Sequence, residues 1–227
     1  MKKTNGKNND KKIGQIKKRP FGIGGSDANK IVYDNWLDLY NLKLGITEQD
    51  DLSDVLPVQM GVATEQFNRE WFTKQTDLMV STEQTIWYND YIYGNVDGIV
   101  WSSLASVKSS YDNWMELDST AIAIFEAKHT NQFNNSEAKK LQQVDKYYPQ
   151  LQHYMMCAKL DKAYLSMFFG NLNYDYLEIG ADKDFQKKLL LAYDHFWKAI
   201  LHKDSKEINT TWGEFHGITN EPIALSS

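Results

Sequence analysis

The chain has 227 residues, of which 42% are hydrophobic and 13% aromatic, enough for one large domain with a buried core. It contains no run of about 18 apolar residues, so we expect no membrane span, and no apolar stretch follows the polar N-terminus, which argues against a secretory signal. The single cysteine, Cys157, excludes an internal disulfide and a four-cysteine metal or iron–sulfur site within one chain. We therefore expect an intracellular protein.

Positive charge is concentrated at the N-terminus. Residues 1–19 contain eight Lys or Arg and one Asp, a net charge of +7, whereas the whole chain has −5 and the remainder therefore −12. A basic arm on an acidic body is typical of a protein that contacts phosphates in one place and repels them elsewhere. A disordered tail that only aids solubility is an equally good interpretation, because Lys, Asn and Gly tails are common.

The N-terminal part of the chain predicts helices. Residues 1–17 have the composition of a disordered arm, and the glycine-rich turn 21–25 precedes Ser26, which we expect to cap a helix. A second helix is expected over 36–44, and an acidic loop over 46–56 separates it from the next element.

From residue 58 onward the pattern changes from a helix to a mixed sheet. The third helix, over 58–76, has an apolar stripe that we expect to be buried: Met60, Ala63, Phe67, Trp71 and Phe72. Strands are then predicted at 78–80, 85–88, 91–93, 99–101, 121–128, 163–169 and 174–179. A polar insertion at 102–119 interrupts them, and the last two helices are expected over 137–158 and 182–202.

This order of elements predicts one α/β (α+β) domain with a mixed sheet. We place the domain at residues 18–205, between the basic arm and a C-terminal tail at 206–227.

Three charged residues in two separate segments, Asp97 and the pair Glu126 and Lys128, give the strongest indication of function. Asp97 lies on one predicted strand, next to a turn, and Glu126 and Lys128 lie on a second, near the end of the apolar run that starts at Ala121. Residues two apart on a strand point to the same face, so Glu126 and Lys128 should lie together. A carboxylate at the end of a buried strand is costly unless it is paired or binds a metal. Two carboxylates and a lysine form a compact site for Mg²⁺ and for phosphodiester cleavage.

Other polar residues have both a functional and a structural interpretation. Glu65 on the third helix is a further metal or water ligand, or an ordinary exposed glutamate. Gln150 and Tyr154 share a helix face, and they either contact a scissile-strand phosphate or simply pack at the rim of the helix. An Asp-Gly pair such as Asp97-Gly98 is, taken alone, usually a turn.

The glycine-rich turn could hold a phosphate through backbone N–H groups at the start of a helix. It lacks the Gly-Lys-Ser/Thr ending of a nucleotide P-loop, and Asp27 would repel a nucleoside triphosphate. Arg19, seven residues before Ser26, could add a charged phosphate contact.

Six motifs in a fixed order resemble the YqaJ-type viral recombinases, the phage lambda exonuclease family within the PD-(D/E)XK nuclease superfamily. The resemblance runs from about Arg19 to Trp197. Its motifs are Gly22-Ile23-Gly24-Gly25-Ser26-Asp27, Trp36-x-x-x-Tyr40-x-x-Lys43-x-Gly45, Met60-Gly61 with Glu65, Val96-Asp97-Gly98, Phe125-Glu126-Ala127-Lys128, and Tyr148-x-Gln150-x-Gln152, before Phe196-Trp197.

The resemblance implies a PD-(D/E)XK core, a central mixed sheet flanked by helices, and a 5′-to-3′ exonuclease that acts on double-stranded DNA. The enzyme would depend on Mg²⁺, replaceable by Mn²⁺, with two ions bound and 3′ overhangs as products. It also implies double-stranded DNA ends and a single-strand annealing protein as partners, a homotrimer, and action in the cytoplasm of a phage-infected bacterium.

The resemblance further implies roles for particular residues. Asp97, Glu126 and the carbonyl of Ala127 would bind metal, Lys128 would be the catalytic lysine, and Glu65 and Gln150 would be accessory active-site residues. The residues expected to contact DNA or its 5′-phosphate are Arg19, Ser26, Asn95 (where a serine is expected) and Tyr154. Two alternatives remain: a structure- or site-specific endonuclease on the same core, and a DNA-end-binding protein without catalysis.

Overall fold

The computed structural model describes residues 20–33, 36–102 and 121–217. The arm, Arg19 and all but the first residue of the 102–119 insertion lie outside these residues. The helices of the described parts are α1 (Gly25–Tyr33), α2 (Trp36–Lys43), α3 (Leu56–Thr76), α5 (Glu137–Ala158), α6 (Lys183–His202), η1 (Lys206–Ile208) and α7 (Trp212–His216). The strands are β1 (Met79–Val80), β2 (Gln84–Trp87), β3 (Tyr93–Val96), β4 (Gly98–Trp101), β5 (Ala121–Thr130), β6 (Lys162–Phe169) and β7 (Asn173–Gly180).

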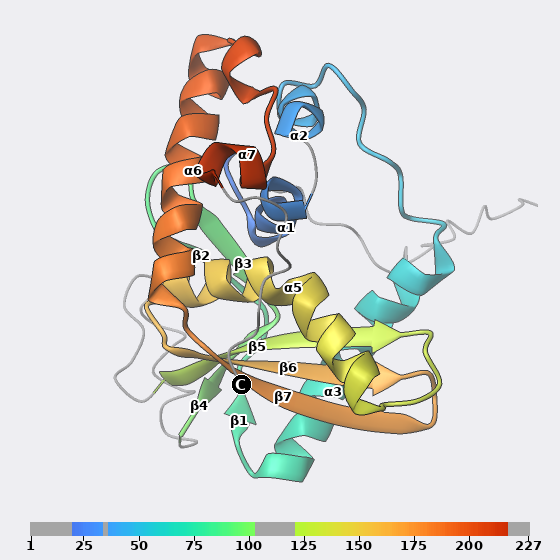
Figure 1. The fold of residues 1–227 in the computed structure, drawn as a ribbon. Coiled ribbons are helices and arrows are strands. Elements are labelled where there is room, and N and C mark those ends of the chain that lie inside the picture. The colour runs from blue at the N-terminus through green and yellow to red at the C-terminus, as the bar shows by residue number, and fades with distance from the viewer. Residues whose placement is uncertain (1–19, 34–35, 103–120, 218–227) are drawn as a thin grey trace, which may run out of the picture.

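A five-stranded mixed sheet forms the centre of the fold, in the order β1-β4-β5-β6-β7. Only β5 and β6 are parallel, and α5 is the crossover between them. Figure 1 shows α5 on one face of the sheet and α3 on the other, with α1, α2, α6 and α7 stacked beyond α5. The expected mixed α/β fold is therefore confirmed.

The layers bury three apolar clusters. One lies among the stacked helices around Trp36 and Phe196, one between α5 and the sheet around Leu151 and Leu165, and one between α3 and the sheet around Phe72. Burial of this apolar surface is the main force that holds the helices on the sheet. None of the helices described is long and apolar enough to cross a membrane.

The start of α1 differs from the prediction, because Ser26 does not cap the helix. The helix begins at Gly25, and the carbonyl of Gly24 accepts the N–H groups of Asp27 and Ala28 at 3.0 and 3.3 Å. The Asp27 carboxylate accepts the N–H of Gly24 at 2.7 Å, as the third helical residue does in a capping box. Ser26 therefore lies within the first turn.

The buried face of α3 also differs from the prediction. Phe72 is buried as expected, but Met60 and Phe67 are 40% and 51% exposed. The helix contacts the sheet through Asn68, which is 1% exposed and donates to the carbonyl of Ser166 at 3.1 Å. The face of α3 that contacts the sheet thus includes a buried polar residue, which hydrophobicity alone did not predict.

Two further segments depart from expectation. The strand expected at 91–93 is β3, which begins at Tyr93 and continues to Val96, so Asn95 lies on a strand and Asp97 joins β3 to β4 directly. The segment expected as a tail from residue 206 folds back in part, because Ile208 and Trp212 are buried against the cluster that contains α6.

Candidate active site

Asp97 and β5 meet where the pairing of β4 with β5 ends. The last pair of this ladder joins Gly98 to Phe125, so Ala127 lies beyond it, and the Asp97 carboxylate takes the place of a strand partner by accepting the N–H of Ala127 at 2.8 Å. The N–H and C=O of one strand residue point toward the same neighbour. The Ala127 carbonyl therefore also faces the edge at which Asp97 lies.

Glu126 and Lys128 lie on one face of β5, as their spacing predicts. Lys128 Nζ and Glu126 Oε1 are 2.5 Å apart, and Lys128 Nζ also lies 4.7 Å from the centre of the Tyr147 ring. Glu126 is 1% exposed. The burial that the sequence suggested for this carboxylate is therefore confirmed.

Helix α5 brings an amide and a phenol to the same carboxylate. Gln150 Nε2 donates to Glu126 Oε1 at 2.7 Å and to the Tyr154 hydroxyl at 3.0 Å. Both side chains are buried. Gln150 and Tyr154 are thus part of the site, not of the rim of the helix.

Glu65 reaches the site from the opposite side of the sheet. Asn68 anchors α3 beneath β5 and β6, and Arg69 Nη1 donates to the Asp97 carbonyl at 3.1 Å. Glu65 is in the preceding turn of the helix, and its pKa responds to the charge of Asp97. The half-buried Glu65 is therefore close enough to Asp97 for the two carboxylates to repel.

The acidic residues share a raised affinity for protons. Burial, followed by the charge of Asp97, raises the pKa of Glu126 to about 8 and that of Glu65 to about 7. Burial also raises the pKa of Asp97, although Lys128 and the Ala127 N–H oppose it. Burial disfavours the charged form of Lys128, but Glu126 and Asp97 outweigh it and raise the Lys128 pKa. Lys128 is therefore a cation in this site.

A polar cavity of about 250 Å³ connects these groups to the N-terminal glycine turn. Ser26 lines it from α1, and Asn95 lines it from β3 while its Oδ1 accepts the Thr85 hydroxyl at 2.8 Å. The remaining lining residues are Gly24, Gly25, Tyr93, Asp97, Glu126, Lys128, Gln150 and Tyr154. Seven of the ten residues proposed from sequence thus line one cavity. Ala127 lies between two of its lining residues, Glu65 is not among them, and Arg19 lies outside the described residues.

A larger cavity of about 420 Å³ lies between α3 and the β6–β7 hairpin. Its lining includes several aromatic residues, among them Phe67, Trp71 and Phe168. It contains no Asp, Glu, Lys or Arg, so we place the chemistry in the smaller, charged cavity.

The donor set of the smaller cavity fits a hard divalent cation. Glu126 Oε2 is buried and has no hydrogen-bond partner, which is costly for a carboxylate oxygen and is relieved by a bound cation. No three His, Cys, Asp or Glu side chains in the described segments are grouped as a ready-made metal site. An ion here would therefore depend on two carboxylates, the Ala127 carbonyl and water, which suits Mg²⁺ because it retains several waters.

Sequence reasoning missed several residues that support the site. Arg69 Nη1 donates to the Asp97 carbonyl, and Asn29 forms two hydrogen bonds with Gln150. Lys43 Nζ donates to the Gly22 carbonyl and to Asp27 Oδ2, each at 2.6 Å, and so fixes the glycine turn. Lys43 and Asp27 belonged to the quoted motifs, but nothing in their spacing indicated that they pair.

Comparison with known proteins supports the family resemblance. The model of the YqaJ-like viral recombinase domain matches residues 16–161. No curated protein matches significantly. Among solved structures, an alkaline exonuclease (LHK-Exo) from Laribacter hongkongensis has a TM-score of 0.58 at 13% identity, covering 81% of this chain and 89% of that one.

The same exonuclease in complex with dAMP matches equally well. A phage-related exonuclease from Haemophilus somnus 129PT has a TM-score of 0.55 at 14% identity, with 81% of this chain and 96% of that one covered. At such low identity these structures show a shared fold. The family match spans well over half of the chain and includes Asp97 and Glu126, so the protein belongs to the YqaJ-like viral recombinase family.

Proposed function

We propose that the protein is a Mg²⁺-dependent exonuclease that digests duplex DNA from its 5′ ends and leaves 3′ single-stranded overhangs. Family membership and fold support the coarser statement, a phage-type exonuclease. One observation carries the proposed chemistry: the buried Glu126 carboxylate has one oxygen without a partner, beside Asp97 and Lys128. We expect Mn²⁺ to replace Mg²⁺, because both prefer oxygen ligands.

Asp97, Glu126 and the Ala127 carbonyl would hold the metal, one ion or two. Bound there, Mg²⁺ would neutralise the scissile phosphate and lower the pKa of a bound water. Lys128 carries a positive charge in the site, which favours stabilisation of the negative charge that develops on the phosphate over removal of a proton. Glu65, with a pKa of about 7, can accept a proton from water near neutral pH.

The other end of the cavity is suited to a terminal 5′-phosphate. Ser26 lies in the first turn of α1, where N–H groups and the helix dipole favour an anion. Asn95 lines the same cavity and offers an amide donor, while Arg19 precedes the turn by a few residues. We propose these residues as the phosphate contacts. A single-strand annealing protein would receive the overhang, and a ring-shaped homotrimer would keep hold of the duplex.

The test uses linear duplex DNA labelled at either the 5′ or the 3′ end, together with covalently closed circular duplex whose integrity is followed on a gel, each with and without Mg²⁺. With Mg²⁺, we expect labelled mononucleotides to be released from 5′-labelled linear DNA. Closed circles should remain undigested. Rapid cutting of circles would favour the endonuclease alternative. Binding of ends without release of nucleotides under any divalent metal would favour a non-catalytic end-binding protein.

A further inference from the structure

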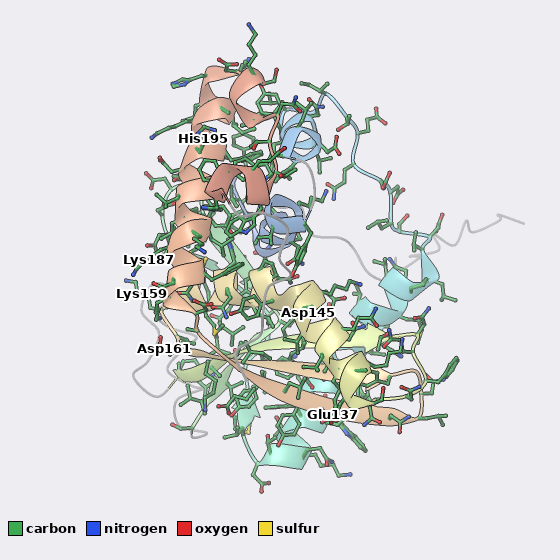
Figure 2. The ribbon with its side chains drawn as sticks, viewed as in Figure 1. Glu137, Asp145, Lys159, Asp161, Lys187 and His195 are labelled. Atoms are coloured by element: carbon green, nitrogen blue, oxygen red, sulfur yellow. The ribbon has the colours of Figure 1, made fainter. Side chains whose placement is uncertain are left out.

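A proline inside α5 creates a connection between this helix and α1. Pro149 has no N–H, so the carbonyl of Asp145 loses its helical donor, and the Tyr33 hydroxyl donates to it instead. The N–H of Gln150, the next residue, donates to Asn29 Oδ1 at 3.0 Å. Figure 1 shows α1 beside the part of α5 where the helix changes direction, and Asp145 is labelled there in Figure 2.

This backbone contact fixes the orientation of two side-chain amides. Only an oxygen can accept a backbone N–H, so Asn29 Oδ1 faces the helix and Asn29 Nδ2 is left to donate to Gln150 Oε1, at 3.3 Å. Gln150 Oε1 is thereby occupied, and the NH₂ of the same amide faces Glu126 Oε1 at 2.7 Å. Asn29 on α1 thus sets the direction of the Gln150 amide by binding its oxygen, while the NH₂ group at the other end faces the Glu126 carboxylate.

We propose that Asn29 is a positioning residue that keeps the Gln150 NH₂ group directed at Glu126 and into the active site. This inference rests on the proposed function. A cation at Glu126 would compete with the donors that this carboxylate now accepts, so Glu126 alone would no longer hold the amide. Asn29 holds it independently. Asn29 also lies three residues after Ser26 on α1, so one helix links the proposed phosphate end of the cavity to its catalytic end.

The decisive substitution is Asn29→Asp, which keeps the shape of the side chain and the oxygen that accepts the Gln150 N–H. It replaces the Asn29 donor to Gln150 Oε1 with a second acceptor, so one end of the Gln150 amide must face an oxygen that repels it. The matched control is Tyr33→Phe, which removes the neighbouring hydrogen bond between the same two helices and leaves Gln150 untouched. Both variants are also made with Gln150→Ala to separate positioning from the added charge.

We expect Asn29→Asp to lower kcat for linear duplex by roughly tenfold or more with little change in KM, and Tyr33→Phe to stay within about twofold of wild type. In the Gln150→Ala background Asn29→Asp should have no further effect. An equal loss in that background would mean that charge alone is responsible, and a wild-type kcat for Asn29→Asp would overturn the proposal directly.

A second readout does not need activity. In the full-length protein, NMR should show a nuclear Overhauser contact between the Gln150 NH₂ protons and the Tyr154 ring, present in wild type and Tyr33→Phe and lost in Asn29→Asp. If wild type cleaves no DNA, the proposed function fails, and this contact still decides whether Asn29 orients Gln150. Persistence of the contact in Asn29→Asp would refute the positioning role even in an active enzyme.

Discussion

The stability of the protein should depend on pH and Mg²⁺ together, through Glu126. Its carboxyl pKa is raised from an ordinary 4.5 to about 8, by burial and then by Asp97. A carboxyl whose pKa is raised by folding stabilises the folded state fully below its unfolded pKa, and this contribution is lost as pH rises through the folded pKa. The free energy of unfolding of the metal-free protein should therefore fall between about pH 5 and pH 8. Mg²⁺ should restore it at the alkaline end.

The size of the effect follows from competition between the proton and the metal. With a pKa of about 8, the carboxyl is protonated in roughly 99 of 100 molecules at pH 6 and in about half at pH 8, so Mg²⁺ should bind roughly 50-fold more weakly at pH 6. A Mg²⁺ concentration about 100 times its Kd at pH 8 stabilises the fold by about 2.7 kcal/mol, or a Tm increase of roughly 5–10 °C for this size. The same concentration at pH 6 should raise Tm by only about 1–3 °C.

The assay is thermal unfolding at pH 6 and pH 8, with and without Mg²⁺, for wild type and Glu126→Gln. The Mg²⁺-dependent increase should be large at pH 8, small at pH 6 and absent in Glu126→Gln. Glu178→Gln is the control, because Glu178 is a carboxylate of the same sheet that pairs with Lys162 and does not line the cavity. Equal Mg²⁺ shifts at both pH values, or a full shift in Glu126→Gln, would refute the assignment of Glu126 as a metal ligand.

Four further variants probe the proposed site and helix α3. Lys128→Met should abolish cleavage but keep the Mg²⁺-dependent increase in Tm, as nuclease and melting assays on one preparation can check. A Cβ on Gly25 would lie 2.3 Å from the Tyr154 ring, so Gly25→Ala should lower the free energy of unfolding by about 1–3 kcal/mol and slow cleavage. Gly61 has open space around it, so Gly61→Ala should instead stabilise α3 by up to about 1 kcal/mol. Arg19→Ala should slow digestion of 5′-phosphorylated ends more than that of 5′-hydroxyl ends; an unchanged ratio of the two rates would make Arg19 a general DNA contact.

The strands that carry the chemistry could be predicted because their signal is local. The apolar run before Glu126 indicates a buried strand, and the two-residue spacing to Lys128 places both side chains on one face. The structure adds that Asp97 lies where β4 stops pairing with β5, so its carboxylate can bond to Ala127. That depends on a register between distant segments, which no local pattern encodes.

The errors have a common physical origin. Hydrophobicity identifies apolar stripes on α3 but not which stripe faces the sheet. The stripe in contact contains the buried Asn68, which donates to the carbonyl of Ser166. The role of Asn29 could not be predicted either, since its partner Gln150 is 121 residues away and the contact lies next to a proline inside α5. Polar contacts between distant elements are therefore what the sequence alone could not supply.

Comparison with two other buried titratable residues shows why the Glu126 site is best explained by function. Both ring nitrogens of His153 are hydrogen-bonded, to Tyr193 and to the Tyr93 carbonyl, and Asp27 is paired with Lys43 and the Gly24 N–H. These groups are buried and satisfied, as structural polar groups are. Glu126 instead keeps an unpartnered buried oxygen, and burial, followed by the charges of Asp97 and Glu65, raises its pKa. Such an arrangement reduces the stability of the metal-free fold at neutral pH and above, so a ligand that neutralises it, a divalent cation, gives the most direct reason for its presence.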